Sequence, residues 1–171
     1  MTEYVALLRA VNVGGTGKLP MATLTELCEA AGFIQVRTYI ASGNVVFRSE
    51  GTEDQIRSSL EDRLRRYAGK SAGVVVRTAS EIADVLARNP FDDAPGNRVM
   101  ALFVDGQLPR DPFEGVTGTK DEQIRLGKRE LFVLYPGGMA ATRLRIPSEK
   151  RGTARNMNTV AKLAEMAAAL A

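Results

Sequence analysis

Residues 36–49 read VRTYIASGNVVFRS, and this stretch decides the fold because it holds two strand-like runs joined by a Gly-Asn pair. Such a pair between two runs of apolar and β-branched residues is typical of a β-hairpin. We predict a two-residue loop, which pairs Ser42 with Val45 and Tyr39 with Arg48.

The segments on either side of the hairpin alternate between strand and helix patterns. Residues 3–11 (EYVALLRAV) are almost continuously apolar, which is typical of a strand buried on both faces. Residues 21–32 and 52–69 show apolar side chains at helical spacing, and 73–78 read as another strand. The order β-α-β-β-α-β predicts a ferredoxin-like arrangement for residues 1–79.

The rest of the chain, residues 80–171, continues this mixture of patterns. Ser80 is the expected start of a helix that ends at Asn89, before Pro90. Beyond it we expect a strand at 98–104, a loop at 105–119, two strands within 122–136 and a C-terminal helix capped by Thr153. We therefore predict the α+β class, with a ferredoxin-like half (1–79) packed against a smaller α+β half (80–171) that ends in a helix.

The chain has no histidine and a single cysteine among its 171 residues. The lack of histidine excludes Ser–His–Asp and Cys–His nucleophiles, His-ligated zinc and a His proton shuttle. Cys28 falls on the apolar stripe of its helix, so we interpret it as a buried structural thiol. Any catalysis must use carboxylates, Lys, Tyr, Arg, backbone amides or a bound metal, and the sequence points to no particular cofactor.

No apolar run approaches the ~18 residues that a membrane span needs. The first apolar stretch carries an acid near its start and ends in Arg9, unlike a signal peptide. We therefore expect a cytoplasmic protein without membrane contact. Its net charge of +3 is compatible with an anionic partner.

Residues 12–20 (NVGGTGKLP) form a glycine-rich loop between the first strand and the first helix. Gly14, Gly15 and Gly17 can present backbone N–H groups to an anion beside a helix N-terminus, and Lys18 adds positive charge. The alternative is a turn that only lets the chain leave a central strand.

This loop matches neither common nucleotide motif. A P-loop has Gly six residues before its Lys and Ser or Thr directly after it, whereas Asn12 and Leu19 hold those positions here. The dinucleotide fingerprint needs a glycine where Pro20 stands.

The predicted C-terminal helix turns one polar side chain inward. Val160, Leu163 and Ala167 mark its buried arc, and Asn156 lies within that arc. Asn156 either completes the helix cap and ties down a neighbouring loop, or joins Arg155 in facing a ligand at the positive helix start.

The segment 141–162 is basic. It carries Glu149 against Arg143, Arg145, Lys150, Arg151, Arg155 and Lys162. A solvated surface is the simple interpretation, and a groove for a polyanion is the alternative. The RNA-binding RRM shares the predicted plan, but SGNVVFRS does not match its aromatic strand signature, so nucleic acid is the weaker alternative. The acidic residues lack metal-loop spacing, and we predict no metal site.

Five blocks of the sequence resemble, in order, the hallmark segments of the bacterial family called domain of unknown function 1697. The blocks are YVALLRAVNVGGTGKLPM, GFIQVRTYIASGNVVF, NPF, ELFVLYPGG and TARNMNTVAKLAEM. The resemblance implies a compact α+β fold with ferredoxin-like elements, and it brings no established activity or catalytic residue. Met157 stands where the family usually has an aromatic residue, and MAATRL differs from the usual GRSKL-like segment.

We therefore predict that the protein binds a small anionic or phosphate-bearing ligand at the loop 12–18 and the start of the last helix. The predicted binding residues are Arg9, Asn12, Gly14, Gly15, Gly17, Lys18, Arg155 and Asn156. One alternative is an enzyme that uses Lys18 or a carboxylate as acid or base, with loop amides as an oxyanion or phosphate hole. Another is a nucleic-acid or protein interaction module that uses residues 141–162.

Overall fold

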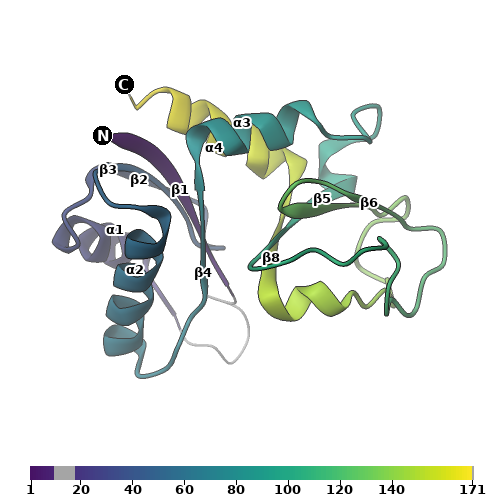
Figure 1. Ribbon diagram of the computed structural model, residues 1–171, viewed down its shortest axis with the longest axis horizontal. Helices are drawn as coiled ribbons and strands as arrows, with labels where there is room; N and C mark the ends of the chain where they lie inside the picture. The colour runs from purple at the N-terminus through teal and green to yellow at the C-terminus, as the bar shows by residue number, and fades with distance from the viewer. Residues whose placement is uncertain (10–17, 171) are drawn as a thin grey trace. The chain divides into compact units, whose positions relative to one another are not determined.

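The computed structural model describes residues 1–9 and 18–170, which group into two compact units (Figure 1). Of these residues, unit 1 comprises 1–9, 18–82 and 163–170, and unit 2 comprises 83–162. Each unit contains a four-stranded antiparallel sheet, and the chain has four α-helices among its described residues, so the predicted α+β class is confirmed.

The two units differ from the predicted halves, 1–79 and 80–171, in two respects. The first boundary lies after Ile82, and the end of the chain from Leu163 groups with unit 1. The description of the halves as domains stays a prediction.

Unit 1 follows the predicted order β-α-β-β-α-β. Its elements are β1 (Thr2–Leu8), α1 (Met21–Ala30), β2 (Ile34–Tyr39), β3 (Asn44–Ser49), α2 (Glu53–Ala68) and β4 (Val74–Thr78). The sheet has the strand order β2-β3-β1-β4, and every neighbouring pair is antiparallel. The apolar strand β1 therefore lies inside the sheet, and ferredoxin-like stays our interpretation of this order.

One face of this sheet packs on α1 and α2. The shared core contains Tyr4, Ala6 and Leu8 from β1, Leu24 and Cys28 from α1, and Ile56, Leu60 and Leu64 from α2. Val5 and Leu7 alternate with the core residues of β1, point to the other face and are also fully buried. Cys28 is fully buried as predicted, and burial raises the pKa of its thiol to about 12.

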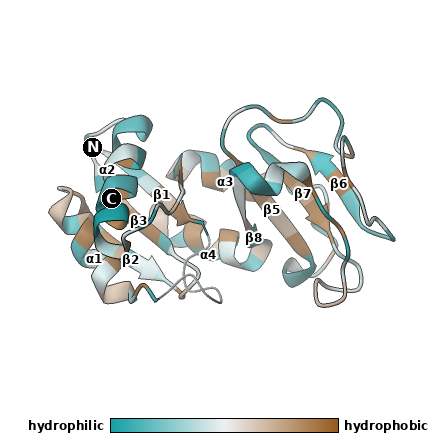
Figure 2. Ribbon diagram, turned by 90° about the horizontal axis from the view of Figure 1, so that it is seen from below, coloured by the Kyte–Doolittle hydropathy of each residue, from teal (hydrophilic) through white to brown (hydrophobic). Residues whose placement is uncertain are grey.

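Unit 2 is built around the second sheet. Its elements are the short 3₁₀ helices η1 (Gly96–Arg98) and η2 (Pro147–Arg151) and the strands β5 (Val99–Val104), β6 (Gln123–Leu126), β7 (Glu130–Leu134) and β8 (Gly152–Asn156). The strand order is β6-β7-β5-β8, again antiparallel. Apolar residues follow β5 and β7 (Figure 2), and their core is completed by Ile124, Tyr135, Leu144 and Ile146.

In both sheets, the edge strand beside the central strand leads directly into a helix. β4 is followed by α3 (Ala79–Ala87), and β8 is followed by α4 (Met157–Ala168). Since the units divide after residues 82 and 162, each of these helices begins in one unit and ends in the other.

The starts of these helices correct two predictions. The predicted cap Ser80 is wrong, because Thr78 caps α3: its Oγ1 accepts the Glu81 N–H at 3.1 Å, and its own N–H donates to the Glu81 carboxylate at 3.0 Å. Thr153 does not cap the last helix. It pairs with the central strand β5 as part of β8, so the helix begins only at Met157.

The β2–β3 hairpin also differs from the prediction. Tyr39 pairs with Asn44, so residues 40–43 form the connection in place of a two-residue loop. The reason is the buried Asn44 side chain, whose Nδ2 donates to the Tyr39 carbonyl at 2.9 Å and closes the longer turn. Arg48 consequently lies opposite Ile34, and the predicted pairing with Tyr39 is wrong.

Candidate functional site

The junction between β8 and α4 carries two of the predicted site residues, Arg155 and Asn156. Asn156 ends β8, and its Oδ1 accepts the Thr159 N–H at 2.9 Å. This amide oxygen caps α4, because the first N–H groups of a helix have no partner within the helix. The helix cap by Asn156 is therefore confirmed, whereas its contact with a neighbouring loop and its contact with a ligand stay predictions.

Arg155 lies next to this cap with its side chain buried. The residue is 7% exposed, and its Nη1 donates to Thr153 Oγ1 at 2.6 Å and to the Ala154 carbonyl at 2.9 Å. Burial lowers the pKa of the guanidinium to about 10, because loss of water disfavours its charged form. The side chain is still a cation at pH 7, and the low dielectric around it weakens the screening of its charge.

Unit 1 has an arginine in the equivalent position, which sequence reasoning missed. Arg77 is the penultimate residue of β4, is 3% exposed, and donates from Nη1 to the Val76 carbonyl at 2.9 Å. Arg155 is the penultimate residue of β8 and makes the same bond to its own predecessor. Thr78 and Asn156 then cap the helices that follow. The available signal was an arginine followed by a capping residue directly before a helix.

The opening segment contributes two described residues to the predicted site. The predicted residues outside the described ranges are Asn12, Gly14, Gly15 and Gly17. Arg9 is half-buried directly after β1, and its N–H donates to the Gly73 carbonyl at 2.8 Å. A Cβ on Gly73 would stand 2.8 Å from Arg9 Cδ, so this glycine makes room for the arginine stem. Lys18 is exposed.

The basic segment 141–162 does not form one uniform surface. Among its basic residues, Arg143, Arg145 and Lys150 are exposed. Arg151 is also exposed, but its Nη1 donates to the carbonyls of Asp105 and Gln107 at 3.3 and 2.9 Å. Arg155 is buried in the sheet. The basic side chains of the segment therefore have three different environments, namely solvent, a loop and the interior of the sheet.

Unit 2 also holds a buried carboxylate, Glu122. Its Oε1 accepts the Lys120 N–H at 2.7 Å, and its Oε2 accepts the Thr142 hydroxyl at 2.7 Å. These bonds, that from Lys120 first, lower the pKa of Glu122, while burial and then the charges of Glu149 and Glu122 raise the pKa of Tyr135 to about 12. Both shifts move the pKa of the group further from 7. A general acid or base works best at neutral pH when its pKa lies near 7. The enzyme alternative stays a prediction.

Two further features concern the whole described part of the chain. Within residues 1–9 and 18–170, no group of three or more Cys, Asp or Glu side chains is placed to hold a metal ion. Over the same ranges, no helix combines the length and the apolar character needed to cross a bilayer.

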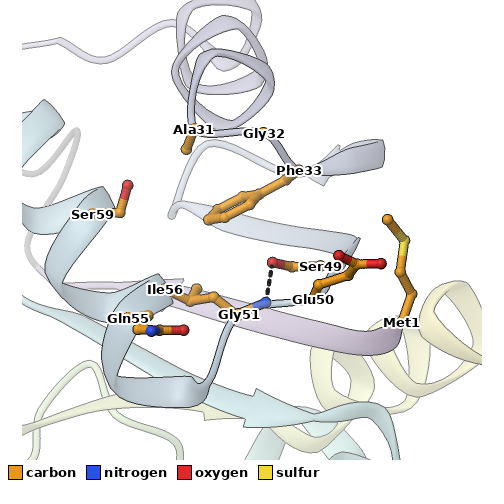
Figure 3. A pocket seen from close by; sticks show the side chains of 10 residues that line it. All are labelled: Met1, Ala31, Gly32, Phe33, Ser49, Glu50, Gly51, Gln55, Ile56 and Ser59. Atoms are coloured by element: carbon orange, nitrogen blue, oxygen red, sulfur yellow. Dashed lines mark hydrogen bonds between the residues drawn. The ribbon is translucent and has the colours of Figure 1, made fainter.

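Each unit also has a pocket. That of unit 1 measures about 320 Å³ and lies between the end of α1 and the start of α2 (Figure 3). That of unit 2 measures about 390 Å³ and lies beside η2. Neither is lined by Arg9, Lys18, Arg155 or Asn156, so these pockets are separate from the described residues of the predicted site.

A solved structure resembles the chain over nearly its whole length. It is described as "The structure of conserved bacterial protein SP0830 from Streptococcus pneumoniae", and it matches with a TM-score of 0.80 and 25% sequence identity over 97% of this chain and 98% of that chain. A search of curated proteins finds no match. The model of the family described as "Protein of unknown function (DUF1697)" matches residues 1–132. The chain therefore belongs to the DUF1697 family.

Proposed function

We propose that this protein binds a small anionic or phosphate-bearing ligand with the segment 12–18 and the start of α4. The residues that we assign to this function are Arg9, Asn12, Gly14, Gly15, Gly17, Lys18, Arg155 and Asn156. The observation that carries the proposal is the buried guanidinium of Arg155, directly before the residue that caps α4.

Burial makes Arg155 a stronger partner for an anion than an exposed arginine. Exposed ion pairs typically contribute only about 0–1 kcal/mol, because water screens both charges. A guanidinium that has already lost most of its water forms stronger charge-assisted hydrogen bonds. Its bonds to Thr153 and Ala154 hold the head in one orientation before any ligand arrives.

The start of α4 adds to this attraction. A negative charge at the N-terminus of an exposed helix is stabilised by about 0.3–1 kcal/mol. The glycine-rich sequence of the segment 12–18 offers further backbone N–H donors, and the exposed Lys18 brings positive charge to its end.

Amide NMR spectra of the full chain, titrated with inorganic phosphate and with pyrophosphate, test the proposal. We expect saturable shifts at residues 12–18 and at Arg155 and Asn156. Lys18→Gln should weaken binding by about threefold, the size of an exposed charge contact. Lys70→Gln, which removes another exposed lysine of unit 1, serves as the matched control and should leave the affinity unchanged. Titrations that shift neither segment would contradict the proposal.

The exposure of Arg143 and Lys150 favours polyanion binding as the second candidate function. Binding of this kind releases counterions, so its affinity falls steeply as salt is added. A labelled single-stranded RNA whose electrophoretic mobility does not change with added protein, even at low salt, would remove this candidate.

A further inference from the structure

The pocket of unit 1 has a fixed apolar wall. The Phe33 ring enters it from the end of α1 (Figure 3) and is held by stacking on Phe47, with ring centroids 4.3 Å apart and planes 8° from parallel. Ile56 of α2 lines the opposite side. The volume of about 320 Å³ lies at the lower end of the range for small-molecule sites, so the pocket suits a short ligand.

Two polar side chains offer hydrogen bonds to this pocket. Ser49 is 7% exposed, and its Oγ accepts the Gly51 N–H at 3.0 Å (Figure 3), which leaves the hydroxyl hydrogen to donate to a ligand. Gln55 accepts the Thr52 N–H with Oε1 at 2.9 Å, which leaves its amide NH₂ group to donate. Apolar and polar groups therefore face the same small space.

Acidic groups outnumber basic ones around the pocket. Among the lining residues, Glu50 has an acidic side chain, Met1 carries the α-ammonium group, and none of the described lining residues is Lys or Arg. The C-terminal end of α1, which carries the negative end of the helix dipole, has no basic residue in its last turn. Glu53 and Asp54 in the first turn of α2 offset the positive end of that helix.

We propose that this pocket binds a small organic cation, in which an ammonium group pairs with Glu50 and a short apolar body lies against Phe33 and Ile56. A carboxylate partner and a helix C-terminus both favour a positive charge, and the apolar wall favours an alkyl chain over a bare metal ion. This second site lies in another part of the chain from the anion-binding residues and takes a ligand of opposite charge, so the two proposals stand or fall separately.

Three probes of similar size separate charge from shape. The full chain is titrated with n-butylammonium, 1-butanol and butyrate, and binding is followed by the amide shifts of Gly32 and Gly51 and the methyl shifts of Ile56. We expect saturable shifts with n-butylammonium at these residues, and an affinity for 1-butanol or butyrate that is at least about fivefold weaker. Equal affinity for butyrate, or shifts that are absent from the pocket, would overturn the proposal.

Two glutamate variants form the matched pair for this test. Glu50→Gln keeps the shape of an exposed side chain and removes its charge, so it should weaken n-butylammonium binding by about fivefold or more. Glu53→Gln removes a neighbouring acid that does not line the pocket, and its effect should stay within about twofold. An unchanged affinity in Glu50→Gln, or equal losses in both variants, would overturn the assignment of Glu50.

Discussion

Arg77 and Arg155 are buried basic residues near the ends of the edge strands β4 and β8. Both side chains are almost fully buried, one residue before a side chain that caps a helix. Burial of a charge is unfavourable, and an apolar residue of similar volume is often at least as stabilising. Departures of this kind from local rules tend to mark functional positions, which is why Arg155 stands at the centre of the proposed function.

The buried thiol of Cys28 gives a prediction about pH. Burial raises its pKa from 9.0 to about 12, so the folded protein keeps the thiol protonated over a range in which the unfolded chain ionises it. The resulting stability is fully present below pH 9.0 and is lost as the pH rises towards about 12. We expect the free energy of unfolding in urea to fall between about pH 9 and about pH 11.

Cys28→Ala is the control for this prediction, because alanine does not titrate. The variant should lose the part of the pH dependence that the thiol causes. If the free energies of unfolding of variant and wild type fall in parallel over this pH range, the assignment to Cys28 is wrong.

The sequence analysis located the buried Cys28 but not the buried Arg77, and the difference has a physical reason. The inward position of Cys28 follows from helical spacing, which depends only on neighbours along the chain. The burial of Arg77 depends on both faces of the sheet being covered, and arginines are mostly exposed, so the local pattern of an arginine before a capping residue marks the position without predicting its burial.

At the scale of elements, Glu130 holds the turn between β6 and β7 to Arg88, the residue that directly follows α3. This carboxylate, 2% exposed, accepts Arg88 Nη2 at 2.8 Å and the N–H groups of Lys128 and Arg129 at 3.2 and 3.1 Å. A side chain at Gly127 would collide with the same carboxylate. One buried group therefore connects the end of a helix to a strand turn far along the chain.

We expect Glu130→Gln to lower the free energy of unfolding by about 1–3 kcal/mol, because the amide loses the charge that these donors share. Asp84→Asn, measured beside it in urea, is the control: Asp84 contacts Arg88 and Lys128 from a far more exposed position, so its loss should be smaller. A Glu130 variant as stable as the wild type would contradict this role.

The existence of most elements could be predicted from the sequence, whereas several of their ends could not. Apolar spacing predicts α1 and α2, and α2 begins with a Thr52–Gln55 capping box, a motif that can be read from the sequence. Residues 152–156 include residue types that often cap helices, yet they pair with β5, about fifty positions earlier in the chain. Such non-local pairing overrides local preference, and it moved the start of the last helix to Met157.

At the scale of the whole molecule, the two sheets share one plan. Each has a hairpin, a central strand, and an edge strand that leads into a helix, in the orders β2-β3-β1-β4 and β6-β7-β5-β8. The sequence shows no fixed repeat, because α1 and α2 have no counterpart among the described helices of the second unit and the spacing between equivalent strands differs. The two sheets are thus alike in strand topology, although their amino-acid sequences show no repeat.

The division of α3 and α4 between the two units gives a prediction about how the protein unfolds. α3 and α4 each contribute residues to both units, and a helix forms cooperatively along its length. We expect hydrogen exchange in rising denaturant to give β1 and β5 the same free energy of opening, within about 0.5 kcal/mol. Loss of protection in one sheet while the other stays closed would show that the units unfold independently.

The central claim is that the junction of β8 and α4 binds an anion, and the phosphate affinity of Asn156→Asp tests it most directly. Asp caps a helix as well as Asn, so the free energy of unfolding should stay within about 0.5 kcal/mol of the wild type. The new negative charge lies next to Arg155 and should weaken phosphate binding by about tenfold. A stable variant that binds phosphate as tightly as the wild type would contradict the claim.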